Sequence, residues 1–311
     1  MSDKTRFGFA PARTENLTEV LTRRAELQDV PSFRLAAYNV YNLFGGDPDV
    51  YSRRPNAPAP GEQLDALGEM ILDLDADVIA FEEVQNEKVL SDLFRSRVNP
   101  TLKRKRQRPF ESFVLVPARD PRGINVALAT RLAVNGTMTF HDREFGPESE
   151  RAMRFSRDLL GVELYATTTY RFLFFVAHLK SKIGGEVAEA KRGLEADEIR
   201  TILDEPVFGS QNAFIEQDMI LAGDMNDDPG TRVIQILEGA AGKTRLRDVF
   251  APVEPNFTFP THDRYAKTRL DFVFTSPTIR VDSPVIHRDN PAAAAASDHY
   301  PISVTVTVTV P

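Results

Sequence analysis

The 311-residue sequence contains no cysteine and no tryptophan. Without cysteine, the protein has no disulfide framework, no thiolate metal site and no cysteine nucleophile. Long apolar runs are also missing, because none approaches the ~20 residues that a membrane-spanning helix needs. The N-terminal residues lack the continuous apolar segment of a secretory signal. We therefore expect a cytoplasmic protein without membrane association, although a processed secreted chain would share these features.

A surplus of positive charge is missing as well. The chain has 38 basic and 45 acidic residues, which gives a net charge of −7. Proteins that bind polyanions over their whole surface usually carry a basic surplus, so general affinity for nucleic acid is not expected. A local field can still differ from the total. For the strongest basic cluster we favour a solvated helix end and loop over a polyanion site; it comprises Arg97, Lys103, Arg104, Lys105, Arg106 and Arg108.

Segments of strand type and helix type follow one another from Phe33 onward. Strands are predicted where Val, Ile, Phe and Thr are dense, at 34–40, 77–84, 112–116, 125–130, 134–140, 162–169, 172–179, 218–222, 270–275 and 302–310. Helices are predicted where apolar residues recur three and four apart, at 63–74, 88–97, 187–203 and 231–237. So many strands exclude a doubly wound parallel sheet. We predict an α/β (α+β) fold in which two packed sheets carry helices on their outer faces.

The predicted domain organisation is an N-terminal extension over residues 1–30 and a single domain over 31–311. A capping box indicates a short helix over about 17–28 in the extension. No linker is long enough to split the rest of the chain, and the short alanine run at 292–296 is predicted to be a loop.

Polar side chains gather where the apolar strands end. They are Asn39, Asn42, Glu82, Glu83, His178, Lys180, Asp224, Asn226, Asp271, Asp298 and His299. Each one alone fits an ordinary turn or the first exposed residue after a strand. Their repetition at one strand end after another is not explained by turns, and active sites are commonly built along one rim of a β scaffold.

Spacing adds detail to this rim. Residues two apart on a strand share a face, so Lys180 beside His178 indicates an anion site. By the same spacing, Asp224 and Asn226 bring a carboxylate and an amide together. Adjacent residues point to opposite faces, so only one of the two neighbouring glutamates 82 and 83 can reach a given site.

Six short motifs, in order from Asn39 to Pro301, resemble the endonuclease/exonuclease/phosphatase superfamily of metal-dependent phosphoesterases, which includes deoxyribonuclease I and exonuclease III. The motifs are YNVYNL, FEEV, AHLKS, GDMND, RLDFVF and SDHYPI. The resemblance implies a four-layer α/β/β/α sandwich of two mixed sheets flanked by helices. That architecture agrees with the strand surplus.

The resemblance also implies a divalent metal, Mg²⁺ with Mn²⁺ or Ca²⁺ as substitutes. Asn39 and Glu83 would hold it, with Glu83 as the main ligand, and Asp298 would approach it. Mg²⁺ held by one or two carboxylates can neutralise the oxygens of a phosphodiester. Two positions depart from the family pattern: Glu82 stands where many members have glutamine, and Tyr41 stands where some DNA-repair members have an acid.

For catalysis, the resemblance implies that Asp224 and Asn226 surround the scissile phosphate. His299, paired with Asp271, would contact the phosphate and activate or orient water, and His178 would be a second acid. A histidine can carry a proton near neutral pH, and an aspartate partner fixes its tautomer. The family position of Arg122 and Asn125 implies that they are further phosphate ligands, and Lys180, beside His178, is predicted to bind the substrate as well.

The sequence therefore predicts a Mg²⁺-dependent phosphodiesterase, with nucleic acid as the expected substrate and no obligate protein partner. An inositol-polyphosphate phosphatase or a sphingomyelinase-like phosphodiesterase is the alternative within the same chemistry. A binding module that has lost catalysis is a third interpretation, which the full set of acids and histidines disfavours. DNA or RNA preference, endo or exo action and the number of metals remain open.

Overall fold

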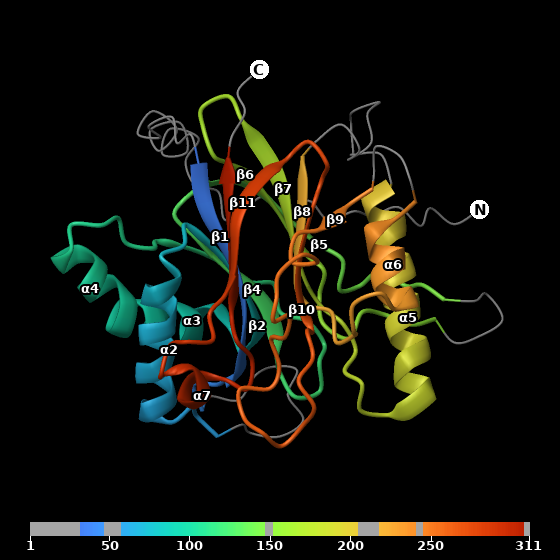
Figure 1. Ribbon diagram of the computed structural model, residues 1–311, viewed down its shortest axis with the longest axis horizontal. Coiled ribbons are helices and arrows are strands. Elements are labelled where there is room, and N and C mark those ends of the chain that lie inside the picture. Colours follow the sequence, from blue (N-terminus) through green and yellow to red (C-terminus); the bar gives the residue numbers. More distant parts are fainter. Residues whose placement is uncertain (1–31, 47–56, 147–151, 205–217, 241–244, 308–311) are drawn as a thin grey trace.

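The computed structural model describes residues 32–46, 57–146, 152–204, 218–240 and 245–307. Within these residues the chain forms two packed six-stranded sheets with helices on both outer sides (Figure 1). This confirms the predicted α/β sandwich. The helix predicted over 17–28 lies outside the described residues, as do positions 308–310 of the last predicted strand.

The first sheet has the strand order β11-β12-β1-β2-β4-β3. Only β1 and β2 pair in parallel, and the other neighbours are antiparallel. The strands are β1 (Ser32–Leu43), β2 (Val78–Val84), β3 (Ser112–Val114), β4 (Asn125–Thr130), β11 (Arg280–Ile286) and β12 (Ile302–Thr307).

The second sheet has the order β5-β6-β7-β8-β10-β9, and its single parallel pair is β7 with β8. The strands are β5 (Ala133–Thr139), β6 (Leu160–Tyr165), β7 (Arg171–His178), β8 (Met219–Asp224), β9 (Arg247–Asp248) and β10 (Asp271–Thr275). The parallel pairs matter for function, because the carboxyl ends of paired parallel strands meet at one edge of the sheet.

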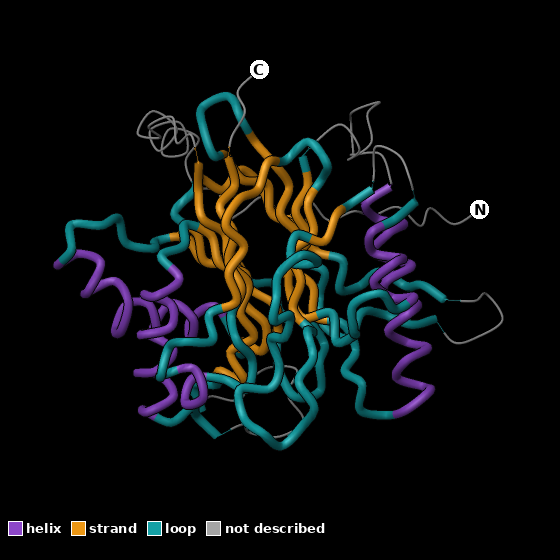
Figure 2. Tube along the Cα trace, in the orientation of Figure 1, coloured by secondary structure: helices purple, strands orange, loops and turns teal. Residues whose placement is uncertain are grey.

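The helices cover the outer faces, as Figure 2 shows in purple on either side of the orange strands. On the first sheet lie α2 (Gly61–Leu74), α3 (Glu87–Leu93), a π-helical turn (Phe94–Val98), α4 (Asn99–Arg104) and α7 (Ala293–Ala296). On the second sheet lie α5 (Gly185–Asp204) and α6 (Arg232–Glu238). None of the described helices has the length and apolarity to cross a bilayer.

Apolar side chains fill three layers that follow from strand alternation. In β1, for example, Ala37 faces the second sheet, whereas the neighbouring Ala36 and Tyr38 face the helices. The inner layer holds side chains of both sheets. The two outer layers join the first sheet to α2, α3 and α7, and the second sheet to α5 and α6. Burial of all three apolar layers is the main stabilising term.

Some elements differ from the sequence-based expectation. The edge strand β11 was not predicted because polar Asp282 and Ser283, a bulge and Pro284 interrupt its alternation. The helix predicted at 88–97 continues through the π-helical turn into α4, where Pro100 stands in the first turn and needs no hydrogen-bond donor. The alanine run expected to be a loop contains the short helix α7, whose Ala293 and Ala296 are buried against α2.

Gly223 in β8 is closely surrounded by the neighbouring strand β7 and by Glu82 of the first sheet. Its φ is +134°, and an added Cβ would lie 2.1 Å from the Ala177 carbonyl oxygen and 2.8 Å from Glu82 Oε1. We expect Gly223→Ala to lower the free energy of unfolding by about 3 kcal/mol through backbone strain and this clash. Denaturant titration measures it.

The matched control is Gly193→Ala in α5, where an added Cβ meets nothing within 4 Å. Alanine is the better helix former by about 1 kcal/mol, so this variant should be at least as stable as the parent. Equal stability of the two variants would contradict the close approach at Gly223.

Candidate active site

The polar rim is the end of the inner layer. His178, Asp224 and Asp271 end or begin three adjacent strands of the second sheet and lie opposite one another in the register. Asn39 and Glu82 occupy paired positions in the first sheet. All five continue the alternation of the inward-facing apolar residues, so the apolar layer between the sheets ends in a layer of buried polar groups.

Two hydrogen bonds join the sheets through this layer. Asn39 Nδ2 donates to Asp224 Oδ2 at 3.0 Å, and His299 Nδ1 lies 2.8 Å from Asp271 Oδ2. Both histidines also approach the same carboxylate oxygen, with His178 Nε2 at 3.5 Å and His299 Nε2 at 3.8 Å from Asp224 Oδ2. The structure thus brings these five predicted residues together, from segments far apart in the sequence.

The His299–Asp271 pair governs the charge at the centre. Burial alone would lower the pKa of His299, but Asp271 opposes it through charge and a hydrogen bond, and with Asp224 and Asp298 raises the pKa to about 10. His299 is therefore an imidazolium at neutral pH. Burial raises the pKa of Asp224 to about 7, against the opposing effect of His299. Asp224 can thus exchange a proton near neutral pH.

His178 has the opposite character. Burial, followed by the nearby charge of Arg157, holds its pKa well below the usual range. It is therefore neutral, and its Nδ1 has no hydrogen-bond partner among the described residues. A neutral imidazole beside Asp224 can offer an N–H to an oxygen of a bound anion, and an anion would in turn favour its protonation.

The two neighbouring glutamates take different positions, as expected from strand alternation. Glu82 is fully buried between the sheets and its oxygens have no hydrogen-bond partner among the described residues; burial raises its pKa well above the usual range. Glu83 has φ +66° and reaches the edge, where Oε2 accepts from the Asn42 backbone N–H at 3.0 Å. Tyr41 and Asn42 are left-handed too, which indicates strain built into this rim.

The donor set at this edge suits a hard divalent cation. Glu83 is partly exposed, and among the described residues the Asn39 amide oxygen accepts only the Tyr41 N–H, at 3.1 Å. Burial raises the pKa of Asp298, and the nearby charge of Glu83 raises it further. No group of three or more His, Asp or Glu side chains among the described residues has the spacing of a closed metal site. Carboxylate and amide oxygens in this open arrangement fit a metal that keeps several water ligands.

Asn226 is brought to the rim by a turn rather than by strand alternation. The strand β8 ends at Asp224, and Asn226 adopts a left-handed φ of +51°. Its backbone N–H donates to Asp224 Oδ1 at 2.8 Å, and Nδ2 donates to the Leu179 carbonyl oxygen at 3.2 Å. The contact with the Asp224 carboxylate is therefore made by the Asn226 backbone, whereas the side-chain amide bonds a carbonyl oxygen, which the two-residue spacing did not predict.

Arg157 is a site residue that the sequence did not reveal. It is almost fully buried, donates to the Leu179 carbonyl oxygen at 3.1 Å, and pairs with Asp120 at 3.3 Å. It therefore shares a carbonyl with Asn226 and lies beside His178. No motif marks it; a buried arginine becomes evident only when its partners, 37 and 22 residues away in the chain, are placed around it.

The other predicted phosphate ligands lie nearby with different surroundings. Arg122 is half-exposed, with Nη2 3.9 Å from Glu83 Oε1 and Nε 3.7 Å from Asp120 Oδ1. Lys180 turns away from the alternation because β7 ends at His178, and its Nζ donates to the Ile183 carbonyl oxygen at 3.2 Å. Partial burial, followed by Arg157, lowers the pKa of Lys180.

Asn125 is not available as a phosphate ligand. Its Oδ1 accepts from the Ala118 N–H at 2.7 Å, and its Nδ2 donates to the carbonyl oxygens of Val84 and Gln85 at 3.2 and 2.7 Å. The structure therefore corrects the sequence-based assignment, because backbone groups occupy the amide on both sides. Asn125 fixes the segment that follows Glu83.

We expect Asn125→Ala to lower the free energy of unfolding by about 3 kcal/mol, because three buried backbone groups lose their partner. Thermal or denaturant unfolding measures the loss. Asn135→Ala, at an exposed asparagine, is the control and should change stability by less than about 0.5 kcal/mol. A stable Asn125→Ala protein with a raised KM would restore the role of phosphate ligand.

Ser297 links the segment that contains His299 to strand β1, which carries Asn39. Its Oγ donates to the Asn39 carbonyl oxygen at 2.7 Å and accepts the His299 N–H at 3.1 Å. The segment lies between α7 and β12 and belongs to neither element. His299 takes its carboxylate partner from Asp271 and not from its neighbour Asp298.

The chain resembles known proteins in sequence and in fold. The sequence profile of the Endonuclease/Exonuclease/phosphatase family matches residues 36–299. No curated protein matches the sequence. Three similar solved structures illustrate the fold. A Bacteroides thetaiotaomicron mannosyl-6-phosphatase has 20% identity and a TM-score of 0.59, covering 89% of this chain and 100% of its own. The human Nocturnin catalytic domain has 17% identity and a TM-score of 0.60, covering 91% of this chain and 97% of its own. Truncated Caenorhabditis elegans TDP2 has 15% identity and a TM-score of 0.57, covering 91% of this chain and 100% of its own.

Proposed function

Because this chain belongs to the endonuclease/exonuclease/phosphatase family of phosphoester hydrolases, we propose that it is a divalent-metal-dependent phosphodiesterase that cleaves nucleic acid. The observation that carries the proposal is the cross-sheet cluster at Asp224, where two histidines and the Asn39 amide converge on one carboxylate oxygen. One of these histidines is held as a cation by Asp271. Such a cluster provides acid, base and anion-binding groups within a few ångströms of one another.

Glu83 and Asp298, with the Asn39 amide oxygen, would hold the metal. Mg²⁺ is the proposed ion, and Mn²⁺ or Ca²⁺ are its substitutes. When bound, it supplies positive charge to the phosphate oxygens and lowers the pKa of water. The partial exposure of Glu83 leaves room for the water ligands that Mg²⁺ usually keeps.

The remaining groups divide the proton chemistry. The pKa of Asp224 near 7 suits a group that accepts a proton from the attacking water. The imidazolium of His299 donates a charge-assisted hydrogen bond to a phosphate oxygen and is held in place by Asp271. His178 is placed to offer an N–H to the leaving oxygen, and Asn226 and Arg157 add donors on the same side.

An aromatic surface beside His299 favours a nucleotide as substrate. The ring of Phe259 lies 5.0 Å from the His299 ring, and Tyr265, which is 64% exposed, stacks on Phe259 at 5.8 Å with an interplanar angle of 23°. Bases stack on aromatic side chains in many proteins that bind single strands. An exposed ring so near the site supports a substrate that has a base next to the scissile phosphate.

A substrate panel with and without EDTA tests the proposal. It contains plasmid DNA, RNA, bis-p-nitrophenyl phosphate, an inositol polyphosphate, mannose 6-phosphate and sphingomyelin. We expect cleavage of DNA or RNA that stops on addition of EDTA and returns with Mg²⁺. Release of phosphate from only the sugar or inositol phosphate, or hydrolysis of only sphingomyelin, would replace the nucleic acid in the proposal.

A further inference from the structure

The basic cluster of the sequence forms a compact projection, which we call the basic turn. It comprises residues 103–108 at the end of α4 and in the loop that follows. Five of these six residues are basic and all six are exposed. In Figure 1, α4 lies at the far side of the first sheet from α5, so the turn projects from the flank of the molecule.

The basic turn has a fixed backbone. The Asn99 side chain makes two hydrogen bonds with the backbone of Phe110: Nδ2 donates to the Phe110 carbonyl oxygen at 2.8 Å, and Oδ1 accepts the Phe110 N–H at 2.9 Å. The Gln107 N–H donates to the Leu102 carbonyl oxygen at 2.9 Å, and Leu102 and Phe110 are buried. Arg106 adopts a left-handed φ of +57°, which costs energy for a long side chain. The segment is thus the solvated helix end and loop expected from the sequence, and its backbone has a defined conformation.

Within the part of the chain that the structure describes, no carboxylate pairs with the cations of the basic turn. Lys103, Lys105, Arg106 and Arg108 form no ion pair with any described residue, and Arg104 donates to the Thr101 hydroxyl at 2.7 Å. The preceding helical segment differs, because Lys88 and Arg95 both pair with Asp92. A protein with net charge −7 thus concentrates unpaired positive charge at one place, which attracts anions locally.

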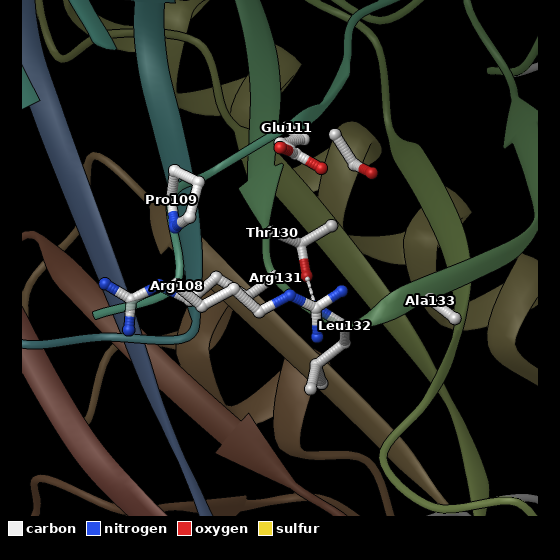
Figure 3. A pocket seen from close by; sticks show the side chains of 8 residues that line it. Arg108, Pro109, Glu111, Thr130, Arg131, Leu132 and Ala133 are labelled. Carbon is white, nitrogen blue, oxygen red and sulfur yellow. Dashed lines mark hydrogen bonds between the residues drawn. The ribbon is translucent and has the colours of Figure 1, made fainter. Parts of the chain in front are cut away.

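A polar pocket continues the basic turn onto the first sheet (Figure 3). Its lining includes Arg108, Ser112, Thr130 and Arg131. Arg131 is 11% exposed in its side chain, pairs with Asp77 through Nη1 at 3.4 Å, and stacks over Phe110 at 4.6 Å. Its buried Nε has no hydrogen-bond partner among the described residues. Glu111 also lines the pocket. The guanidinium groups and hydroxyls offer donors to an anion such as a phosphate.

The basic turn and the active site lie at opposite ends of β4. Asn125, at one end, bonds the residues just after Glu83, whereas Thr130, at the other end, lines the pocket. Six residues of an extended strand span about 17 Å at ~3.4 Å per residue. A nucleic acid backbone advances ~3.4 Å per nucleotide in a duplex strand, so about five stacked nucleotides bridge the distance, and an extended single strand needs fewer. A mononucleotide or dinucleotide is too short.

We propose that the basic turn is a second binding surface for the phosphate backbone of a polymeric nucleic acid, which it holds while a phosphodiester several nucleotides away lies in the active site. The inference rests on the proposed function and narrows its substrate to chains of several nucleotides. Backbone contacts of this kind position a strand without reading its sequence. We therefore expect length dependence without base preference at this surface.

The test uses the full chain and a variant in which the five cations become glutamine (K103Q/R104Q/K105Q/R106Q/R108Q). Binding of fluorescein-labelled oligothymidylates of 20 and 3 nucleotides is measured in EDTA, which prevents turnover. We expect the variant to bind the 20-mer at least about 10-fold more weakly and the 3-mer equally well. The slope of log K against log salt should fall by about 3, at ~0.7 per phosphate contact on a single strand.

Two controls separate charge from other effects. Lys88→Gln/Arg95→Gln removes exposed cations that already have a carboxylate partner and should leave binding unchanged. Replacing Arg104, Arg106 and Arg108 by lysine keeps the charge and should restore most of the affinity for the 20-mer. Circular dichroism melting checks that each variant is folded.

The outcomes distinguish this proposal from the proposed function. If the wild type cleaves the 3-mer and the 20-mer with equal kcat/KM and the five-fold variant binds both as the wild type does, the second surface is refuted and the phosphodiesterase stands. If the wild type cleaves no nucleic acid, the proposed function fails, while the EDTA binding assay still decides the surface. Binding to phosphatidylserine vesicles in place of the 20-mer would also overturn the proposal.

Discussion

Replacing His299 with alanine should lower kcat about 1,000-fold while the protein stays folded. The imidazolium that Asp271 holds would be lost, and with it a charge-assisted donor to the phosphate. Groups that transfer protons or stabilise charge in this way typically contribute between about 100- and 10,000-fold. The measurement is kcat and KM on the best substrate of the panel, with thermal unfolding as the folding check.

A double-mutant cycle with Asp271→Asn tests whether the two residues act as a unit. Asparagine keeps the size and an acceptor oxygen but removes the charge that raises the pKa of His299. We expect Asp271→Asn to lose part of the rate and the double variant to be no slower than His299→Ala alone, because residues of one unit are strongly non-additive. A near-normal rate in His299→Ala would show that the histidine is structural.

Glu83→Gln should weaken binding of Mg²⁺ by at least about 100-fold. Loss of a residue that only supports a metal ligand already lowers metal affinity by up to about 100-fold, so loss of a direct ligand should cost at least as much. The amide removes the negative charge of the side chain predicted as the main ligand while preserving its size. Activity at limiting Mg²⁺ should fall and should recover in part at high Mg²⁺. Calorimetric titration of the metal into the protein gives the affinity without substrate.

Glu82→Gln is the matched control for this prediction. Burial keeps the Glu82 carboxyl uncharged, because its pKa lies well above the usual range, so an amide of the same shape changes no charge there. Its Mg²⁺ affinity should remain close to that of the parent. If Glu82→Gln loses the metal and Glu83→Gln retains it, the assignment of the ligand is reversed.

The sequence could predict the strands and the rim because both depend on local patterns. Each site residue except Arg157 follows or precedes an apolar run that the structure confirms as a strand. The order of the family motifs along the chain indicated that these strand ends belong to one site. The left-handed backbone conformations of Tyr41, Glu83 and Asn226 could not be predicted, because residues other than glycine adopt them only when the surrounding groups impose them. Strand alternation alone therefore gave an incomplete account of Asn226.

Partners distant in the chain were beyond local patterns. The Asn39–Asp224 hydrogen bond joins residues 185 positions apart, and a pattern of apolar residues says nothing about which strand ends face one another. The same reason explains Asn125. The family resemblance implied a phosphate ligand at Asn125, and only the neighbouring carbonyl groups show that its amide N–H groups are already used.

The chain path through the two sheets has a consequence for biosynthesis. The first sheet is built from β1–β4 and from β11 and β12, whereas the second is built from β5–β10. His299 precedes β12, the last of the described strands, and its partner Asp271 begins β10. Since a chain is synthesised from its N-terminus, the acid–base pair cannot exist on a ribosome-bound chain until β12 has emerged and docked beside β1. The cross-sheet cluster at Asp224 is therefore completed only after β12 has been synthesised.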